Sequence, residues 1–264
     1  MERRMALFVI PVFLVTGFLA LPLATIFWKA LPQAGFWDAL QRPLVTKTLR
    51  LSLSTSGISL VGSLVCGTPV AYLLARRRFP GAAMIETLID MPMVLPPSVA
   101  GVALLMTFGR RGLLGSWFSL FGLSIAFTPV AVILAQSFVS LPLYIRAARA
   151  GFHSVDQELE RVAYTLGHSP LSTFTRVTVP LAFPALLSGA VMAWARALGE
   201  FGATIMFAGN FLGRTQTMPL AIYTAMESDL TAALALSVIL VIVSFSVLLG
   251  VRLALHRSPF GAYA

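Results

Sequence analysis

The sequence has little charge for its length. Asp, Glu, Lys and Arg make up 11% of its 264 residues, whereas 58% are hydrophobic. A water-soluble domain has roughly 25% charged residues. This deficit excludes an ordinary soluble fold for most of the chain and indicates that most of it lies in lipid. A second, soluble catalytic domain would not fit, because about six spans of about 20 residues each would use roughly half of the chain.

Cysteine and lysine are nearly absent. A single cysteine, Cys66, excludes a disulfide framework or a cysteine-based metal site. The two lysines, Lys29 and Lys47, do not stand in the Gly-x-x-x-x-Gly-Lys-Ser/Thr pattern of a phosphate-binding loop. The sequence also lacks a Ser-His-Asp constellation and any metal-ligand spacing among its three histidines. We therefore expect no enzyme, cofactor or metal site here, and any ATP that drives the protein must bind to another chain.

Long apolar runs are what the sequence has instead. They cover residues 6–28, 51–75, 82–108, 126–145, 177–208 and 230–251, each long enough for a spanning helix. The first run is longer than the apolar region of a signal peptide, which has about 7–15 residues, so we interpret it as an uncleaved span. The sequence thus predicts an all-α membrane protein with about six transmembrane helices.

The formal net charge of +9 comes from short arginine clusters between the apolar runs, which argues against a nucleic-acid-binding face. Basic residues concentrate on the cytoplasmic side of membrane proteins. One side of the predicted spans carries Arg3, Arg4, Arg76, Arg77, Arg78, Arg146, Arg149, Arg161, Arg176, Arg252 and Arg257. This bias predicts that both termini and the loop at 146–176 are cytoplasmic.

The third apolar run contains Pro92, Pro96 and Pro97. Proline removes a backbone donor and clashes with the preceding helical turn. Broken backbone at membrane depth persists only where protein buries it or where it lines a cavity. A simple helix kink and a break that lines a pathway are both open, and the second makes Pro96, Pro97 and Ser98 candidate pathway residues.

Charged residues also stand where charge is costly. Arg196 and Glu200, in the fifth run, are four residues apart and can pair on one helix face. Such residues normally face the bundle interior or a water-filled cavity, so either a packing ion pair or an anion pathway is possible. Arg110 and Arg111 lie on the side where basic residues are disfavoured. Either they belong to an ordinary loop or they bind an acidic protein surface or the anion itself.

The loop at 153–176 predicts two short amphipathic helices outside the membrane. Ser154 followed by Gln157 forms a capping box that would start the first helix. Gly167 is placed to end it in the left-handed conformation, and the Ser169–Pro170 pair would start the second. Apolar residues recur on one face of the first helix at Val155, Leu159, Val162 and Leu166. From the pattern alone, this face could lie on the membrane or bind a partner.

A family pattern runs through this loop. It consists of Glu160-Arg-Val-Ala163, Leu166-Gly167, Ser169-Pro170, Arg176-Val-Thr-Val-Pro180 and Gly189. The pattern resembles the EAA loop of the permeases of binding-protein-dependent ABC importers, although Arg161-Val162-Ala163 replaces the usual Glu-Ala-Ala and the acid stands one place earlier. The resemblance implies coupling helices that seat in a groove of a separate ATPase, which binds ATP and Mg. It assigns this coupling to Glu160, Arg161, Ala163, Leu166, Gly167, Ser169 and Pro170.

Further segments narrow the resemblance to molybdate and tungstate permeases. They are Pro92-Met-Val-Leu-Pro-Pro-Ser-Val-Ala-Gly101, Gly109-Arg-Arg-Gly-Leu-Leu-Gly115, Ala195-Arg-Ala-Leu-Gly-Glu-Phe-Gly-Ala-Thr204, Thr217-Met-Pro219 and Tyr223. Sulfate and thiosulfate permeases share the Leu-Gly-Glu-Phe-Gly stretch, whereas the paired arginines at 110 and 111 favour molybdate. A gradient-driven secondary transporter is the alternative from a different class.

The resemblance also implies an assembly. Its expected members are two copies of this chain, an ABC ATPase subunit, and a periplasmic or lipoprotein oxyanion-binding protein, in the inner membrane of a prokaryote. The implied fold is that of a type I ABC importer permease. We expect residues 1–45 to hold the first span and a periplasmic loop, 46–255 the transmembrane domain, and 256–264 a cytoplasmic tail.

Overall fold

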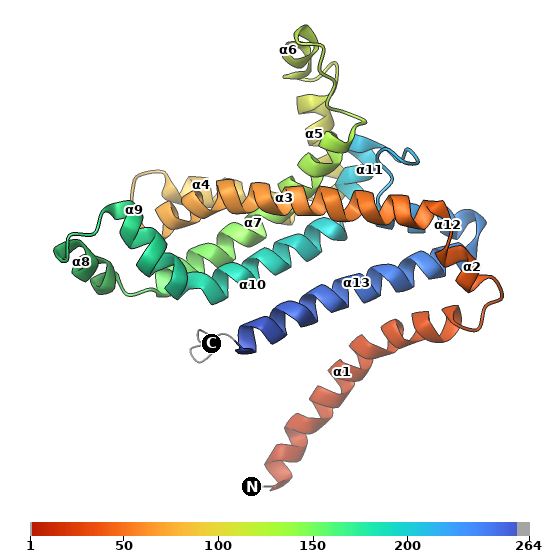
Figure 1. Ribbon diagram of the computed structural model, residues 1–264, viewed down its shortest axis with the longest axis horizontal. Coiled ribbons are helices and arrows are strands. Elements are labelled where there is room, and N and C mark those ends of the chain that lie inside the picture. Colours follow the sequence, from red (N-terminus) through yellow and green to blue (C-terminus); the bar gives the residue numbers. More distant parts are fainter. Residues whose placement is uncertain (1, 258–264) are drawn as a thin grey trace.

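The computed structural model describes residues 2–257, and all its regular elements over that range are helices (Figure 1). Within the described residues, five helical segments are long and apolar enough to cross a membrane, or six if one bent pair counts as a span. The single segments are α1 (Glu2–Ala30), α3 (Pro43–Arg76), α7 (Pro129–Ser154), the segment Pro170–Leu198 that ends with α10, and α13 (Leu230–Arg257). The predicted all-α membrane fold is confirmed. The tail at 258–264 lies outside the described residues.

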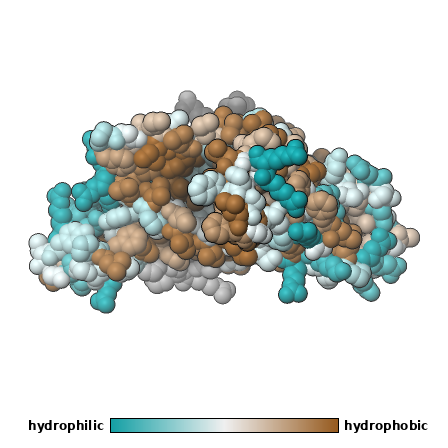
Figure 2. Space-filling view, turned by 90° about the horizontal axis from the view of Figure 1, so that it is seen from above, coloured by the Kyte–Doolittle hydropathy of each residue, from teal (hydrophilic) through white to brown (hydrophobic). Residues whose placement is uncertain are grey.

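Shorter helices complete the chain. They are α2 (Phe36–Leu40), α4 (Ala82–Val94), α5 (Pro97–Phe108), α6 (Gly115–Leu120), α8 (Gln157–Thr165), α9 (Pro170–Thr173), a π-helix (Phe174–Thr178), α10 (Val179–Leu198), α11 (Gly202–Ala208) and α12 (Met218–Ser228). Figure 2 shows hydrophobic surface over much of the middle of the molecule, with hydrophilic residues toward both ends of the long axis. This distribution is what a bundle that crosses a membrane lengthwise requires.

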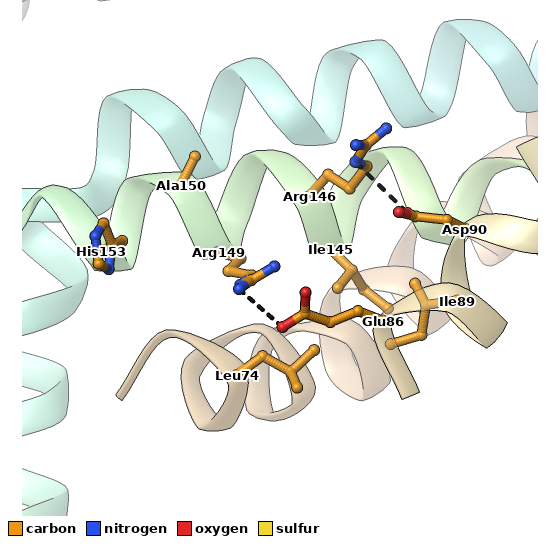
Figure 3. A pocket seen from close by; sticks show the side chains of 9 residues that line it. All are labelled: Leu74, Glu86, Ile89, Asp90, Ile145, Arg146, Arg149, Ala150 and His153. Carbon is orange, nitrogen blue, oxygen red and sulfur yellow. Dashed lines mark ion pairs between the residues drawn. The ribbon is translucent and has the colours of Figure 1, made fainter. Parts of the chain in front are cut away.

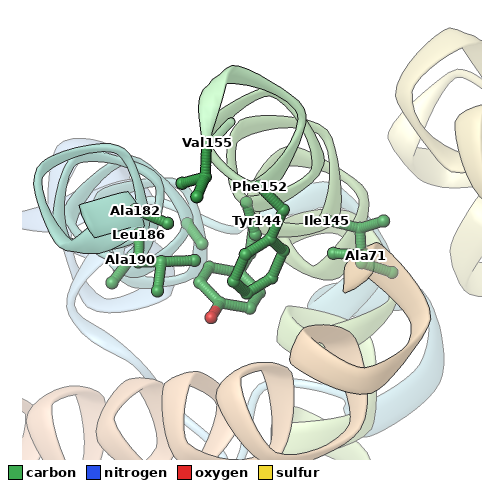
Figure 4. Close-up of a cluster of buried hydrophobic side chains, with 10 residues drawn as sticks. Ala71, Tyr144, Ile145, Phe152, Val155, Ala182, Leu186 and Ala190 are labelled. Atoms are coloured by element: carbon green, nitrogen blue, oxygen red, sulfur yellow. The ribbon is translucent and has the colours of Figure 1, made fainter. Parts of the chain in front are cut away.

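The centre of the bundle consists of α3, α7 and α10 (Figure 1). Tyr144 and Phe152 of α7 fill the space beside Ala71 of α3 and Ala182 and Ala190 of α10 (Figure 4). Lipid tails are as apolar as the side chains, so membrane helices associate mainly through close packing at small residues. The small residues on α3 and α10 provide that approach.

The third apolar run is broken rather than kinked. α4 and α5 are bent by 115° at the break, and Figure 1 shows α5 projecting out of the bundle. Pro96 is the N-cap of α5, and Pro97 occupies its first turn, where a missing N–H costs no hydrogen bond. The run at 82–108 therefore forms two helices with different directions.

Two glycines hold α5 against α11. A Cβ on Gly101 would lie 2.6 Å from Cβ of Met206 and 2.8 Å from the carbonyl oxygen of Ala203. A Cβ on Gly202 would lie 2.6 Å from Cβ of Pro97. Only glycine permits this approach of the two backbones, which fixes α5 on the bundle at its broken end.

Three helix boundaries differ from the predictions. Ser154 is the last residue of α7 and not an N-cap, because α7 continues nine residues past the predicted end at 145. The N-cap of α8 is Asp156, whose side chain accepts a hydrogen bond from the backbone N–H of Glu158 at 3.0 Å. The predicted second loop helix is not separate, because α9 runs through the π-helix into α10.

Candidate functional site

The loop between α7 and α10 forms a helical hairpin at one end of the bundle, where α8 and α9 lie beyond the ends of α3 and α7 (Figure 1). Gly167 has φ +83 and ends α8. The N–H of His168 donates to the carbonyl of Ala163 at 3.0 Å across this turn. Ser169 caps α9 by accepting a hydrogen bond from the N–H of Ser172 at 3.3 Å, and Pro170 follows at the first helical position. The predicted turn at Gly167 and the predicted start at Ser169 are both confirmed.

A buried polar cluster fixes α8 to the bundle. Oε1 of Glu160 accepts hydrogen bonds from Nη2 of Arg76 at 2.7 Å and from Oγ1 of Thr178 at 2.8 Å. The guanidinium of Arg76 also donates to the carbonyl of Val155 at 3.1 Å. The side chains of Arg76 and Glu160 are only 7% and 9% exposed. Glu160 therefore ties α8 to α3 and to the π-helix, and its carboxylate is not available at the surface of the loop.

The outer side of the loop is apolar and exposed. We call Leu159, Val162, Leu166 and Leu171 the loop face. Leu166 and Leu171 are 75% and 73% exposed, whereas Val155, predicted on the same face, is buried at the end of α7. Arg161 lies beside the loop face, is exposed, and pairs with Glu158 at 2.5 Å. Ala163 is buried on the inner side of α8. Among the residues predicted to couple to the ATPase, those that face outward are therefore Arg161, Leu166, Gly167, Ser169 and Pro170.

The predicted pair of Arg196 and Glu200 is present, but not within one helix. α10 ends at Leu198, and Glu200 lies in the turn before α11 with a side chain that is 1% exposed. Nη1 of Arg196 contacts Oε2 of Glu200 at 2.5 Å, and Oε1 accepts the N–H of Ala203 at 2.8 Å. Glu200 thus caps the start of α11 while it pairs with Arg196, which favours a packing role.

The structure brings the two groups of pathway candidates together. Gly202, two residues after Glu200, lies against Pro97 at the break of the third span. Pro96, Pro97 and Ser98 are exposed at this point. This contact was not predictable from the sequence, since the two segments are about a hundred residues apart.

Arg110 and Arg111 lie in the exposed turn between α5 and α6. Arg110 lines a cavity of about 340 Å³ together with Arg214, Phe127 and Phe211. The cavity is at the start of α7, and the 26 residues of that helix separate it from α8 by about 39 Å. Arg214 was not among the predicted site residues, because its place beside Arg110 depends on how the chain folds.

These features define an integral membrane protein whose bundle of apolar helices carries a clamped helical loop at one end and contains a broken span. Solved structures share this fold. With a bacterial ABC transporter involved in the import of the polysaccharide alginate, the TM-score is 0.73 at 16% identity over 95% of this chain and 93% of that chain. With the MetNI methionine ABC transporter, the TM-score is 0.62 at 18% identity over 79% and 93% of the two chains. The fold is that of a type I ABC importer permease.

The chain belongs to the family of binding-protein-dependent transport system inner membrane components, whose profile matches residues 67–257. The molybdenum transport system permease protein ModB of Mycobacterium tuberculosis is 43% identical over 92% of this chain and 91% of its own length. The probable permease NifC of Clostridium pasteurianum is 44% identical over 80% and 74% of the two chains. The probable sulfate permease cysT of Nephroselmis olivacea is 31% identical over 89% and 84%. The family predicted from the sequence is confirmed.

Proposed function

We propose that this chain is the permease subunit of an ATP-driven importer for a tetrahedral oxyanion, molybdate or tungstate. Relatives named as molybdenum permeases match it at up to 43% identity over nearly its whole length, and a relative named for sulfate matches at 31%. The structural observation that carries the transport role is the clamped α8 with its exposed loop face. An apolar helix face that is held rigidly outward can fit a groove on another protein.

In this proposal two copies of the chain enclose the pathway and two ATPase subunits bind the loop faces. ATP and Mg²⁺ bind to the ATPases, whose closure moves α8 and α9. ATP can change the pathway only if it favours one of the two conformations, since a ligand with equal affinity for both shifts nothing. The loop end then lies in the cytoplasm with both termini, and Pro96, Pro97, Ser98, Arg196 and Glu200 lie along or beside the pathway.

In this proposal, the oxyanion-binding protein binds to the end of the bundle that lies opposite the α8–α9 loop. Arg110, Arg111 and Arg214 gather positive charge there, outside the apolar middle of the molecule. Guanidinium groups bind carboxylates in a bidentate manner, so an acidic rim on the binding protein fits this surface.

Purification and reconstitution test the proposal. The solubilised chain should co-purify with an ABC ATPase, and the complex in proteoliposomes should take up molybdate when ATP and loaded binding protein are added. Uptake of sulfate, but not molybdate, would favour the sulfate importer. Recovery of a stable chain without an ATPase, together with uptake that follows an ion gradient, would overturn the ATP-driven role.

Replacing Gly167 with valine should uncouple ATP hydrolysis from transport. The left-handed φ of +83 costs a residue with a Cβ about 1–2 kcal/mol, so the end of α8 and the loop face would be displaced. The measurement is ATPase stimulation by loaded binding protein. Gly35→Val is the matched control, because Gly35 has φ +87 and open space around it at the other end of the molecule. Normal stimulation in Gly167→Val would contradict a coupling role for this turn.

A further inference from the structure

The helix α4 is attached to the bundle in an unusual way. None of its residues is buried, and the structure describes all of them. Its outward side chains are apolar, with Met84, Leu88 and Val94 at 68%, 55% and 84% exposed. Within α4, Ile89 alone packs against the central core, so burial of apolar surface within this chain contributes little to holding α4 in place.

Charged side chains add to the contact that Ile89 makes. Glu86 and Asp90, four residues apart on α4, face Arg149 and Arg146 of α7 (Figure 3). Nη2 of Arg149 lies 2.8 Å from Oε1 of Glu86, and Nε of Arg146 lies 3.5 Å from Oδ1 of Asp90. Between the two helices is a cavity of about 340 Å³, which Leu74 of α3 and His153 of α7 also line. Close apolar packing is therefore incomplete where the ion pairs form.

The two halves of the broken span, α5 and α4, are held differently. α5 is fixed next to the break by two close contacts with α11. A Cβ added at Gly101 or at Gly202 would lie less than 3 Å from an atom of the facing helix. α4, on the other side of the break, depends on two partly exposed ion pairs, which are weaker than buried ones. The bend at Leu95 and Pro96 joins the fixed part to the loosely held part.

The ion pairs also lie next to the coupling loop. α7 carries both arginines in its last turns and ends at Ser154, and the following residue, Val155, accepts the hydrogen bonds of Arg76. A displacement of α8 therefore reaches Arg149 through less than two turns of helix.

We propose that the Glu86–Arg149 and Asp90–Arg146 pairs form a latch that holds α4 on α7 in the conformation described here and that opens during the transport cycle. The inference rests on the proposed function as a permease. When the coupling loop moves α7, the arginines shift relative to the carboxylates, and α4 swings about the bend while α5 stays on α11. The latch thus determines the position of α4, which is the half of the broken span nearer to the loop.

Charge exchange in the reconstituted complex tests the latch. Glu86→Arg and Arg149→Glu should each raise the ATPase rate without binding protein by about two- to fivefold, because a weakened latch populates the open state. The double exchange E86R/R149E restores an ion pair and should return the rate to within about twofold of wild type. Arg42→Gln is the matched control, since it removes a comparable, partly exposed 2.6 Å pair with Asp229 at the start of α3, whereas the latch lies near the end of that helix. Rates unchanged from wild type in both single variants would overturn the latch.

A cross-link gives a second test that does not depend on the stability of the charge variants. In a Cys66→Ser background, Glu86→Cys and Arg149→Cys are joined by a short, reducible bifunctional thiol reagent. Linked complexes should lose transport and regain it on reduction. Full transport while the helices are linked would contradict opening.

Wild-type complexes distinguish failure of the proposed function from failure of the latch. If wild-type complexes show no ATPase activity that depends on binding protein, the proposed function fails. If the wild type behaves normally and the variants do not differ from it, only the latch is overturned.

Discussion

Arg76→Leu is expected to release α8 from the bundle and to abolish recovery of the ATPase with the chain. The substitution leaves the carboxylate of Glu160 buried with only Thr178 as a hydrogen-bond donor. Removing one partner of a buried ion pair costs about 3–5 kcal/mol, because the remaining charge has lost both water and its counter-charge. This cost is large beside the stability of a nine-residue helix that is otherwise attached through few buried residues. The measurement is co-purification of the ATPase, together with thermal unfolding of the solubilised chain.

Two variants give this prediction its controls. Arg161→Gln removes the exposed pair with Glu158, in which both side chains are more than 60% exposed, and should change stability by less than about 1 kcal/mol. The double variant R76L/E160L replaces the buried pair with apolar side chains and should recover part of the lost stability. ATPase recovery equal to wild type in Arg76→Leu would contradict the role of the cluster.

Gly101→Val should force α5 and α11 apart and destabilise the chain. The new Cβ would lie 2.8 Å from a backbone carbonyl oxygen and 2.6 Å from Cβ of Met206, and neither atom is the end of a flexible side chain. Overpacking of this kind costs about 1–3 kcal/mol, and here it also displaces the bend of the third span. The thermal midpoint in detergent and the rate of uptake should both fall.

Gly62→Val is the matched control for this prediction. Gly62 is an exposed helical glycine with open space around it, so the variant should behave as wild type. An unchanged midpoint for Gly101→Val would show that the two helices can separate without loss.

Features that depend on neighbouring residues were predictable from the sequence. The apolar runs, the turn at Gly167 and the cap at Ser169 each arise from a few consecutive residues, and the structure has them where they were expected. The pairing of Arg196 with Glu200 was predictable because it needs only a spacing of four. The predicted helical continuity between these two residues was wrong, since Glu200 caps α11 instead.

Features that depend on contacts between distant segments were not predictable. The residue that pairs with Glu160 is 84 positions away, and nothing near Arg76 in the sequence distinguishes it from Arg77 or Arg78. The size of the bend at Pro96 follows from the packing of α5 on α11, which the prolines alone do not determine. The start of α8 was predicted two residues too early because Ser154 and Asp156 are both good caps. The extension of α7, whose Arg146 and Arg149 pair with α4, decides between them.

The continuous segment Pro170–Leu198 is a long lever that begins in the loop. Its 29 residues span about 43 Å, so a tilt of about 5° at the loop would carry the other end through about 4 Å. That distance exceeds the diameter of a water molecule, about 2.8 Å. It arises where Arg196, Glu200 and the start of α11 meet the break of the third span. A small tilt at the loop is therefore enough to displace the opposite end of this segment by more than the diameter of a water molecule.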